Sequence, residues 1–347
     1  RSIPEIVIVV LACTMLAGLL PSADLFAGRG DKAGTAAASE LLIPVGARSI
    51  GMGGACLATI NGVEAIYWNP AGLSMASAGT SAMLSHMSYL ADISVDYAAV
   101  STTLADLGAV GFTFKSLSFG NISVTTEDQP DGTGETTSPT FIIVGATFSR
   151  RISDHIAVGI TSNYVYEKIG KVSAADMALN AGVQYSGLGG VDGLTLGVAV
   201  KNVGPRMRYD GSGLFRSAQV DDALVSGSTV KIEAASGELP STIEIGMGYA
   251  MAISGSGKLL LQSSFQNNNF SEDEYRIGGE YAYGGLLFVR GGLAFASESE
   301  GREYIYGPTA GCGIHTRLSD IDVFVDYAYR SVKYFSGNHI IGIELGF

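Results

Sequence analysis

Beyond about residue 79 the chain alternates between apolar and polar positions with a period of two, which predicts β-strands. From Ile321 to Arg330 the odd-numbered positions are apolar or aromatic, and the even-numbered positions include Asp322 and Asp326. Similar alternation occurs over 156–167, 242–249 and 287–295. One face of these strands is therefore apolar, while the other is small and polar.

The charged residues of these strands lie on the polar face and carry both signs. This face is assigned Arg276, Glu280, Arg290, Asp322, Asp326, Arg330 and Glu344. In a soluble β-sandwich each sheet buries its apolar face and exposes its polar face to solvent. A transmembrane barrel instead turns its apolar face to lipid and its polar face to the lumen. Alternation alone is compatible with both.

The connections between the strands distinguish these architectures. About fourteen strands follow residue 79, an even number, as in bacterial outer-membrane barrels. Short turns are expected at 105–107, 151–153, 254–257, 284–285 and 318–319, strictly alternating with longer links at 118–139, 204–240, 267–274 and 297–303. Such alternation favours an all-β fold, a transmembrane antiparallel β-barrel over residues 79–347.

The last strand and the tyrosines also favour a membrane barrel. The segment His339–Phe347 alternates and ends in an aromatic residue, which resembles the signal read by the outer-membrane insertion machinery. Tyrosines near strand ends are expected to form interfacial girdles: Tyr89, Tyr164, Tyr166, Tyr281, Tyr283, Tyr329 and Tyr334.

Residues 40–78 do not alternate and are rich in glycine, which permits tight turns. One or two helical turns are expected over Val63–Trp68, ended by Asn69-Pro70. A barrel of about fourteen strands has a wide lumen. Residues 28–78 are therefore expected to form an N-terminal segment and hatch that plugs it. The hatch motif comprises Gly51, Gly53, Gly54, Asn69, Pro70, Ala71 and Gly72.

The start of the chain resembles an export signal. Ile6–Leu20 is apolar, follows Arg1 and is closed by Pro21, which predicts a signal peptide over 1–27 with cleavage after Ala27. A lipoprotein box ending at Cys13 is the alternative, although the apolar run continues beyond it. Both place the mature protein outside the cytoplasm.

The composition excludes several classes of protein. The 347 residues are 47% apolar and 16% charged, which excludes a disordered chain. With a net charge of −12 and scattered basic residues, no nucleic acid is expected as a partner. The four histidines are dispersed and no hydrolase motif occurs, so neither a metal, a cofactor nor an enzymatic site is expected. Cys56 and Cys312 are expected to be buried free thiols, with a disulfide between them as the alternative.

Several short motifs, in their order and spacing, resemble the PorV/PorQ group of FadL-like barrels. They are Gly46-Ala47-Arg48, Gly51-Met52-Gly53-Gly54-Ala55, Asn69-Pro70-Ala71-Gly72-Leu73, Lys201-Asn202-Val203-Gly204-Pro205, Leu239-Pro240-Ser241-Thr242, Asp326-Tyr327-Ala328-Tyr329 and Gly337-Asn338-His339. The resemblance covers nearly the whole mature chain. It implies an outer-membrane protein of the type IX secretion pathway, in which PorV-type proteins pass cargo to a surface sortase.

Three functions follow from these observations. A secretion protein would dock cargo, sortase or translocon components on its outer loops, and the candidates in 204–240 are Arg206, Arg208, Leu214 and Phe215. A transporter would pass hydrophobic molecules through the lumen, as the wider FadL-like superfamily does. A purely structural barrel is the third. The resemblance favours secretion, although the outer loops are shorter than a cargo shuttle would be expected to carry.

Overall fold

The computed structural model describes residues 32–218, 228–296 and 303–347. The predicted signal peptide lies outside these residues. Within them, no helix has both the length and the apolar character needed to cross a membrane.

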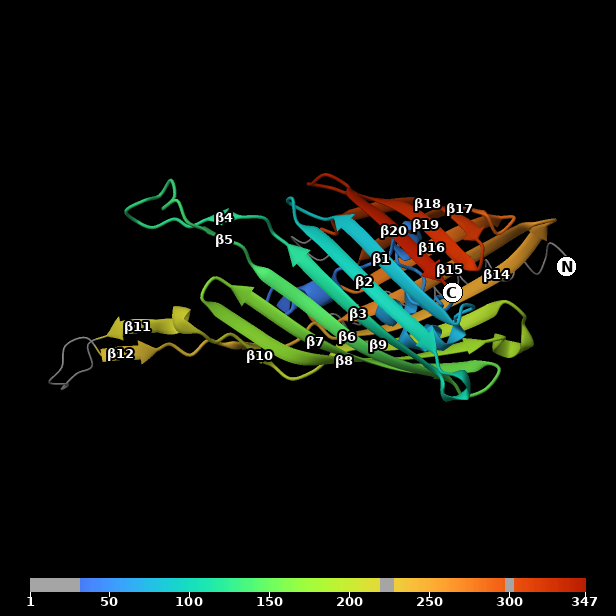
Figure 1. Ribbon diagram of the computed structural model, residues 1–347, viewed down its shortest axis with the longest axis horizontal. Coiled ribbons are helices and arrows are strands. Elements are labelled where there is room, and N and C mark those ends of the chain that lie inside the picture. Colours follow the sequence, from blue (N-terminus) through green and yellow to red (C-terminus); the bar gives the residue numbers. More distant parts are fainter. Residues whose placement is uncertain (1–31, 219–227, 297–302) are drawn as a thin grey trace, which may run out of the picture.

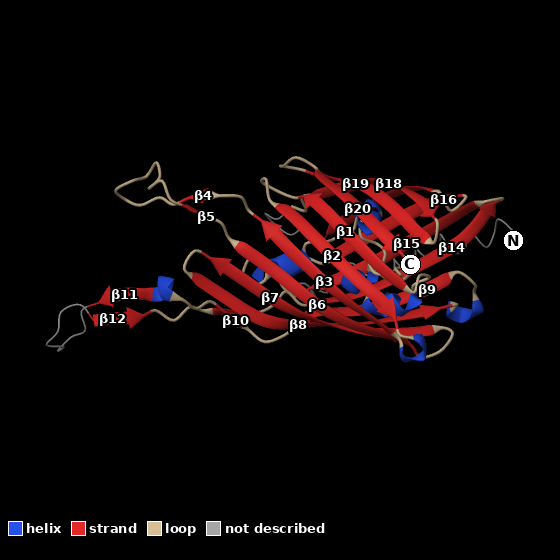
Figure 2. Cartoon of the chain, in the orientation of Figure 1, coloured by secondary structure: helices blue, strands red, loops and turns tan. Residues whose placement is uncertain are grey.

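Fourteen antiparallel strands close into a barrel, which confirms the predicted fold class (Figures 1 and 2). In order around the wall they are β1 (Thr80–Ser88), β2 (Ser94–Thr103), β3 (Ala109–Ser118), β6 (Thr140–Arg151), β7 (Ile156–Ile169), β8 (Val172–Ser186), β9 (Leu194–Val203), β14 (Thr242–Ser254), β15 (Gly257–Asn268), β16 (Glu274–Tyr283), β17 (Leu287–Ala296), β18 (Tyr306–Leu318), β19 (Ile321–Val332) and β20 (Asn338–Gly346). The last strand pairs with the first, with Leu84 opposite Ile343. Closure leaves no unpaired edge in this sheet.

The wall is apolar outside and polar inside. Ile160 and Val325 are 51% and 46% exposed, whereas Thr161 on the opposite face of β7 is 1% exposed. The Thr161 hydroxyl lies 2.8 Å from that of Thr147 on β6. Because the exposed face is apolar and the buried face polar, the barrel has the geometry expected in lipid.

The connections fall into two sets. The short-turn end carries 104–108, 152–155, 255–256, 284–286 and 319–320, with the 3-10 helices η4 (Ala105–Leu107) and η5 (Leu188–Gly190). The long-loop end carries 119–139 and 204–241. These two loops contain β4 (Ile122–Ser123) paired with β5 (Thr136–Thr137), β10 (Met207–Arg208) paired with β13 (Ser236–Gly237), η6 (Ser212–Leu214), and β11 (Phe215–Ala218) paired with β12 (Ser228–Lys231). Figure 1 shows both hairpins projecting beyond the barrel at this end.

The expected strict alternation of connection lengths is wrong around β8, where the link to β9 at the short-turn end spans 187–193. The turn between β7 and β8 lies at the long-loop end but consists only of Gly170 and Lys171. These two strands are 14 and 15 residues long, so they extend as a hairpin of their own. Ser173 on this extension forms a β-bridge with Asp210, which attaches the long loop to the wall.

In the described part of the chain, the short helices η2 (Ser39–Leu42), α2 (Ala47–Gly51), α3 (Ala65–Trp68) and η3 (Pro70–Met75) precede the barrel. The helix expected over Val63–Trp68 begins two residues later. Asn69 is extended, with φ −152° and ψ 103°, because Pro70 disfavours the helical conformation in the residue before it. Pro70 then starts η3, and the Asn69 side chain accepts a hydrogen bond from the Ala71 N–H.

Two sequence predictions require correction. Tyr89 does not belong to an outer girdle, because its hydroxyl lies inside the barrel mouth, 2.7 Å from that of Tyr306. Cys56 is buried but Cys312 is exposed on the outer face opposite Tyr327, so only one of the two free thiols is buried.

Val325→Arg should make the free energy of membrane insertion less favourable by about 2–4 kcal/mol, because it places a cation on the lipid-facing row. Phe324→Arg is the matched control. Phe324 faces the lumen, where its ring stacks on His315 at 4.1 Å, so the same substitution should be tolerated better. Folding into lipid vesicles, followed by heat-modifiable gel mobility, measures both variants. Equal yields would contradict the assignment of the two faces.

Candidate functional site

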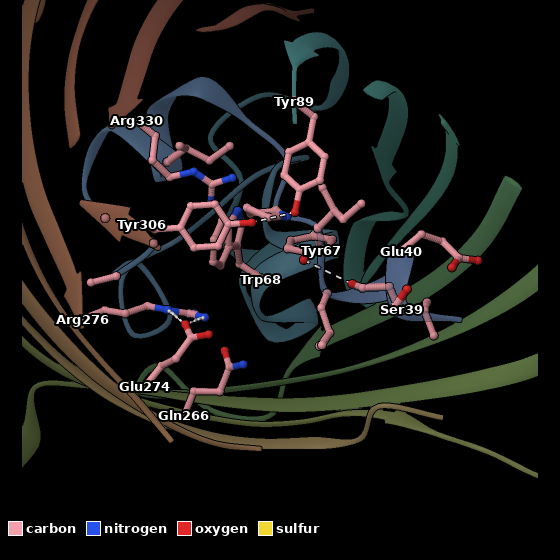
Figure 3. A pocket seen from close by; sticks show the side chains of 18 of the residues that line it. Ser39, Glu40, Tyr67, Trp68, Tyr89, Gln266, Glu274, Arg276, Tyr306 and Arg330 are labelled. Carbon is pink, nitrogen blue, oxygen red and sulfur yellow. Dashed lines mark hydrogen bonds and ion pairs between the residues drawn. The ribbon is translucent and has the colours of Figure 1, made fainter. Parts of the chain in front are cut away.

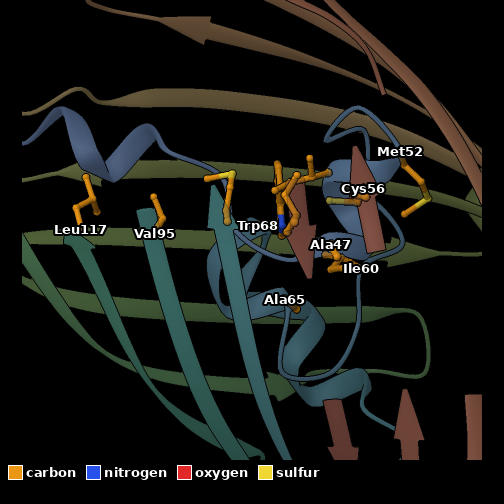
Figure 4. Close-up of a cluster of buried hydrophobic side chains, with 12 residues drawn as sticks. Ala47, Met52, Cys56, Ile60, Ala65, Trp68, Val95 and Leu117 are labelled. Carbon is orange, nitrogen blue, oxygen red and sulfur yellow. The ribbon is translucent and has the colours of Figure 1, made fainter. Parts of the chain in front are cut away.

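The N-terminal segment 39–75 lies inside the barrel, among the inward-facing side chains (Figure 4). Helix α2 contacts β17 to β20, and η3 contacts β6, β7 and β8 on the other side of the lumen. The buried core of the segment includes Ala47, Ile50, Met52, Cys56, Ile60, Ala65 and Trp68. This segment, called the hatch below, therefore forms an apolar core together with inward-facing wall residues such as Val95, Leu117 and Ile340.

The Asn69-Pro70 turn rests directly on the backbone of the wall. A Cβ at Gly159 would lie 2.3 Å from the Pro70 carbonyl carbon, and one at Gly182 would lie 2.0 Å from Asn69 Oδ1. The Asn69 amide donates to the Val183 carbonyl at 3.2 Å. Only glycine at these two wall positions permits so close an approach.

The glycine-rich stretch of the hatch rests on two further wall glycines. A Cβ at Gly278 or Gly292 would lie 2.1 or 2.2 Å from the Met52 backbone. Gly53 has a φ of +68°, and a Cβ there would lie 2.8 Å from the Leu293 nitrogen. The remaining motif residues also pack closely: Gly51 against Gly311, Gly54 against Trp68, and Gly72 against the Ile60 carbonyl, with Ala71 fully buried.

Three of the predicted lumen charges form a chain of ion pairs that begins at Arg48 of the hatch. Arg48 forms a bidentate pair with Glu280, at 2.9 and 3.0 Å. Glu280 Oε2, which accepts from Arg48 Nε, also accepts from Arg290 Nε at 2.6 Å, and Arg290 Nη1 lies 2.5 Å from Asp326. The chain Arg48–Glu280–Arg290–Asp326 thus links the hatch to β16, β17 and β19.

Glu64 lies on the opposite side of Arg48, within the hatch. Its carboxylate accepts from the Ser49 N–H at 3.2 Å. Burial raises the pKa of Glu64 above its ordinary value, against the opposing charge of Arg48. A Cβ at Gly46 would lie 1.9 Å from the same carboxylate, so glycine there makes room for it.

Arg276 belongs to a second charged group, which surrounds the hatch aromatics. Arg276 pairs with Glu274 at 2.8 Å, and Glu244 pairs with Lys201 at 2.7 Å. The ring of Trp68 lies 5.6 Å from Lys201 Nζ and 5.9 Å from the Arg276 guanidinium. These contacts add cation–π attraction between hatch and wall.

The other three predicted lumen charges lie apart from these groups. Asp322 pairs with His315 at 2.8 Å near the short-turn end. A Cβ at Gly62 of the hatch would lie 3.6 Å from the Glu344 carboxylate. Arg330 donates to Asn338 at 2.9 Å and stacks on Tyr306 at 4.0 Å.

A cavity of about 430 Å³ lies between the hatch and the long-loop end (Figure 3). Tyr67 and Trp68 of the hatch line it, together with Arg276, Tyr306 and Arg330 of the wall. Its other side is apolar and is lined by Leu41, Leu42, Ile43, Ile93, Leu117, Phe119 and Phe141. Among the described residues, no group of three His, Cys, Asp or Glu side chains is arranged to hold a metal ion.

The loop candidates lie on the hairpin outside the mouth. Arg206 pairs with Glu238 at 2.5 Å, and Arg208 pairs with Glu233. Both arginines therefore hold the two sides of the hairpin together. Phe215 is 47% exposed, whereas Leu214 is half-buried.

Comparison with known proteins identifies the family. A family model described as type IX secretion system protein PorV matches residues 27–232, more than half of the chain. The chain belongs to the PorV family. The match includes the hatch, the wall from β1 to β9 and part of the longest outer loop.

Solved structures show the fold of this PorV-family protein. The toluene transporter TodX of Pseudomonas putida is 12% identical, with a TM-score of 0.54, covering 86% of this chain and 96% of that one. The monoaromatic hydrocarbon channel CymD is 12% identical, with a TM-score of 0.53, covering 88% and 98%. A FadL homologue of Pseudomonas aeruginosa is 12% identical, with a TM-score of 0.50, covering 88% and 98%. A search of curated proteins finds no match.

The family and the fold together establish a FadL-like barrel of the outer membrane, as the sequence predicted. The wall glycines at 159, 182, 278 and 292 were not assigned a role from the sequence. The sequence does contain a signal for this role, because glycine recurs on the polar face of the alternating strands.

Glu280→Gln should lower the free energy of unfolding of the hatch by about 3–5 kcal/mol, because it leaves the buried Arg290 and the half-buried Arg48 without the carboxylate between them. Trp68 is the single tryptophan and lies in the hatch, so its fluorescence reports the hatch alone. Its unfolding midpoint in urea should fall, while heat-modifiable mobility should still report a closed barrel. Glu303→Gln, which removes an exposed ion pair with Lys333, is the control and should leave the Trp68 midpoint unchanged. An unaltered midpoint for Glu280→Gln would mean that the network does not hold the hatch.

Proposed function

We propose that this barrel takes part in type IX protein secretion by docking cargo or partner proteins on its outer hairpins. The observation that carries the proposal is the PorV family match over residues 27–232. The grouping of both hairpins at the long-loop end supports it, because a docking surface must lie beyond the lipid.

The base of the long hairpin is attached to the wall by several contacts. Asp210 pairs with Lys231 at 2.7 Å across it, and Asp210 also bridges to Ser173 on β8. At its base, Tyr209 donates to the buried Glu167 of the wall. These contacts reduce the ordering cost of binding, because the base of the hairpin is held in place before a partner arrives.

Apolar side chains on this hairpin remain exposed. Phe215 and Ile232 are 47% and 53% exposed, and Ile122 on the β4–β5 hairpin is 48% exposed. Aromatic and aliphatic residues of this kind are typical anchors in protein interfaces. Phe215 is therefore the stronger of the four loop candidates, while Arg206 and Arg208 position the hairpin.

Export and insertion complete the proposal. We propose that residues 1–27 act as a cleaved signal peptide and that the insertion machinery reads the strand ending at Phe347. The Phe347 ring is on the outer face and 55% exposed, and its N–H donates to the Thr80 carbonyl at 2.8 Å. Because this aromatic side chain is exposed beside the two strands that close the barrel, it supports recognition of the last strand before the barrel closes.

Transport of hydrophobic molecules is the second candidate function. TodX is a toluene transporter and CymD is a monoaromatic hydrocarbon channel, and the mouth cavity of this barrel has an apolar side. Uptake of labelled toluene by vesicles containing the purified barrel tests this candidate. An uptake rate equal to that of empty vesicles would exclude it.

Deleting residues 215–231 should abolish surface display of cargo without affecting barrel folding. A short Gly-Ser link can close the gap, because the Ile232 N–H already donates to the Leu214 carbonyl at 2.9 Å. The strands keep their hydrogen bonds, so heat-modifiable mobility should match the wild type. Display is measured by labelling intact cells of the deletion strain.

The matched control removes residues 125–133, the tip between β4 and β5, which leaves the exposed Ile122 in place, and it should retain display. Normal display after deletion of 215–231, together with loss of display when the whole gene is absent, would move docking away from this hairpin. Normal display in the absence of the gene would overturn the secretion proposal itself.

A further inference from the structure

Tyr67 and Trp68 of the hatch form the floor of the mouth pocket, the cavity of about 430 Å³. Tyr67 also lines a second cavity, of about 30 Å³, between the hatch and the inner faces of β2, β3 and β6 to β9. This lysine cavity has a polar lining that includes Tyr97, Thr113, Lys115, Asn163, Asn180 and Lys201. A volume this small holds about one or two species of the size of water, so its occupant is an ion or water and not an organic molecule.

The lining of the lysine cavity is positively charged. Among the described residues that line it, two are lysines and none is acidic. Lys115 Nζ lies 5.1 Å and Lys201 Nζ lies 4.9 Å from the centre of the Tyr67 ring. The two ammonium groups therefore lie around one ring, and their like charges repel each other in an interior that salt screens poorly. A negative ion in the cavity that both lysines line offsets this repulsion.

The two lysines differ in their partners. Lys201 pairs with Glu244 at 2.7 Å. Lys115 forms no ion pair within the described part of the chain, and its Nζ donates to the carbonyls of Glu40 and Ile43, at 2.7 and 2.5 Å. These carbonyls use two of the three N–H donors of Lys115 and leave its charge uncompensated.

The acidic group near Lys115 does not balance this charge at neutral pH. The Glu40 side chain is not part of the cavity lining, and the residue is 1% exposed. Burial, reinforced by the charge of Glu167, raises the pKa of Glu40 to about 8, so this carboxyl is largely neutral at pH 7. An excess of positive charge therefore remains at Lys115.

The cavity lining also contains uncharged donors. Tyr97 is 5% exposed, and its buried hydroxyl has no hydrogen-bond partner within the described residues. Asn180 Oδ1 accepts from the Asn202 N–H at 2.8 Å, so the other polar atom of this side chain is the donor Nδ2. A buried hydroxyl without a partner is destabilising. Donors grouped around uncompensated positive charge favour an anion over water.

We infer that the lysine cavity binds one chloride ion, held by Lys115, Lys201 and the Tyr97 hydroxyl. A polyatomic anion such as phosphate is too large for this volume. Lys115 and Tyr97 belong to the wall, whereas Tyr67 and the two carbonyls that Lys115 binds belong to the hatch. The ion therefore strengthens the attachment of the hatch to β2, β3 and β9. This site is independent of the secretion role, because it needs no cargo.

The test compares sodium chloride with sodium gluconate at equal ionic strength, using the purified full-length barrel. Gluconate is too large for the cavity, and equal ionic strength removes differences in screening. Chloride should raise the urea midpoint of Trp68 fluorescence, because the ring of Trp68 contacts that of Tyr67 at 5.2 Å. The effect should saturate with chloride concentration, as for one site present only in the folded hatch. Crystals grown in bromide should show its anomalous signal beside Lys115 Nζ and the Tyr97 hydroxyl.

Tyr97→Phe removes the hydroxyl and keeps the ring, so the chloride concentration that gives half the effect should rise about tenfold. Lys115→Gln should abolish the chloride effect, because it removes the uncompensated charge. Tyr281→Phe is the matched control, because Tyr281 lies on the outer wall and is 40% exposed. This variant should keep the chloride dependence of the wild type.

Three results would overturn the inference. Equal midpoints in chloride and gluconate would assign the cavity to water. Bromide in the crystals without a chloride effect in solution would mean an adventitious ion only. A chloride effect that persists unchanged in both Tyr97→Phe and Lys115→Gln would place the anion elsewhere on the protein.

Discussion

The wall of a closed membrane barrel does not fill its own lumen, so the polar side chains that point inward need partners from elsewhere in the chain. The ion pair between Arg48 of the hatch and Glu280 of the wall supplies such a partner most directly. Glu280 and Arg290 are adjacent across β16 and β17, and both are buried. Without the hatch, their charges would face an open lumen and water. With it, Arg48 completes a bonded chain that ends at Asp326. The wall charges and the hatch therefore depend on each other, because removing one partner leaves a buried charge uncompensated.

The position of the hatch is determined by shape as well as by charge. Gly159 and Gly182 leave space for the Asn69-Pro70 turn, and Gly278 and Gly292 leave space for Met52. These contacts lie on β7 and β8 on one side, and on β16 and β17 on the other. Because packed interiors do not deform continuously, contact on both sides selects one placement of the hatch. The aromatic floor of the mouth pocket, Tyr67 and Trp68, is held by that placement.

The barrel could be predicted from the sequence because each strand carries its own signal. The alternation around Val325 and the aromatic ending at Phe347 are local and needed no knowledge of distant residues. The site could not be predicted in this way. Arg48 and Glu280 are 232 positions apart, so their pairing depends on how the hatch sits in the closed barrel. Tyr89 shows the same limit, because its place near a strand end does not reveal that it turns inward to Tyr306.

The family and the fold neighbours point to different uses of the same architecture, and the interior distinguishes them physically. A channel for hydrocarbons needs a continuous apolar path, whereas here the floor below the pocket is crossed by paired charges on Arg48, Glu280 and Arg290. Opening that path would separate Arg48 of the hatch from Glu280 of the wall, at a cost that a small apolar ligand has no polar group to offset. Binding at the mouth leaves the network intact. The energetics of the hatch therefore favour docking from outside over passage through the lumen, in agreement with membership of the PorV family.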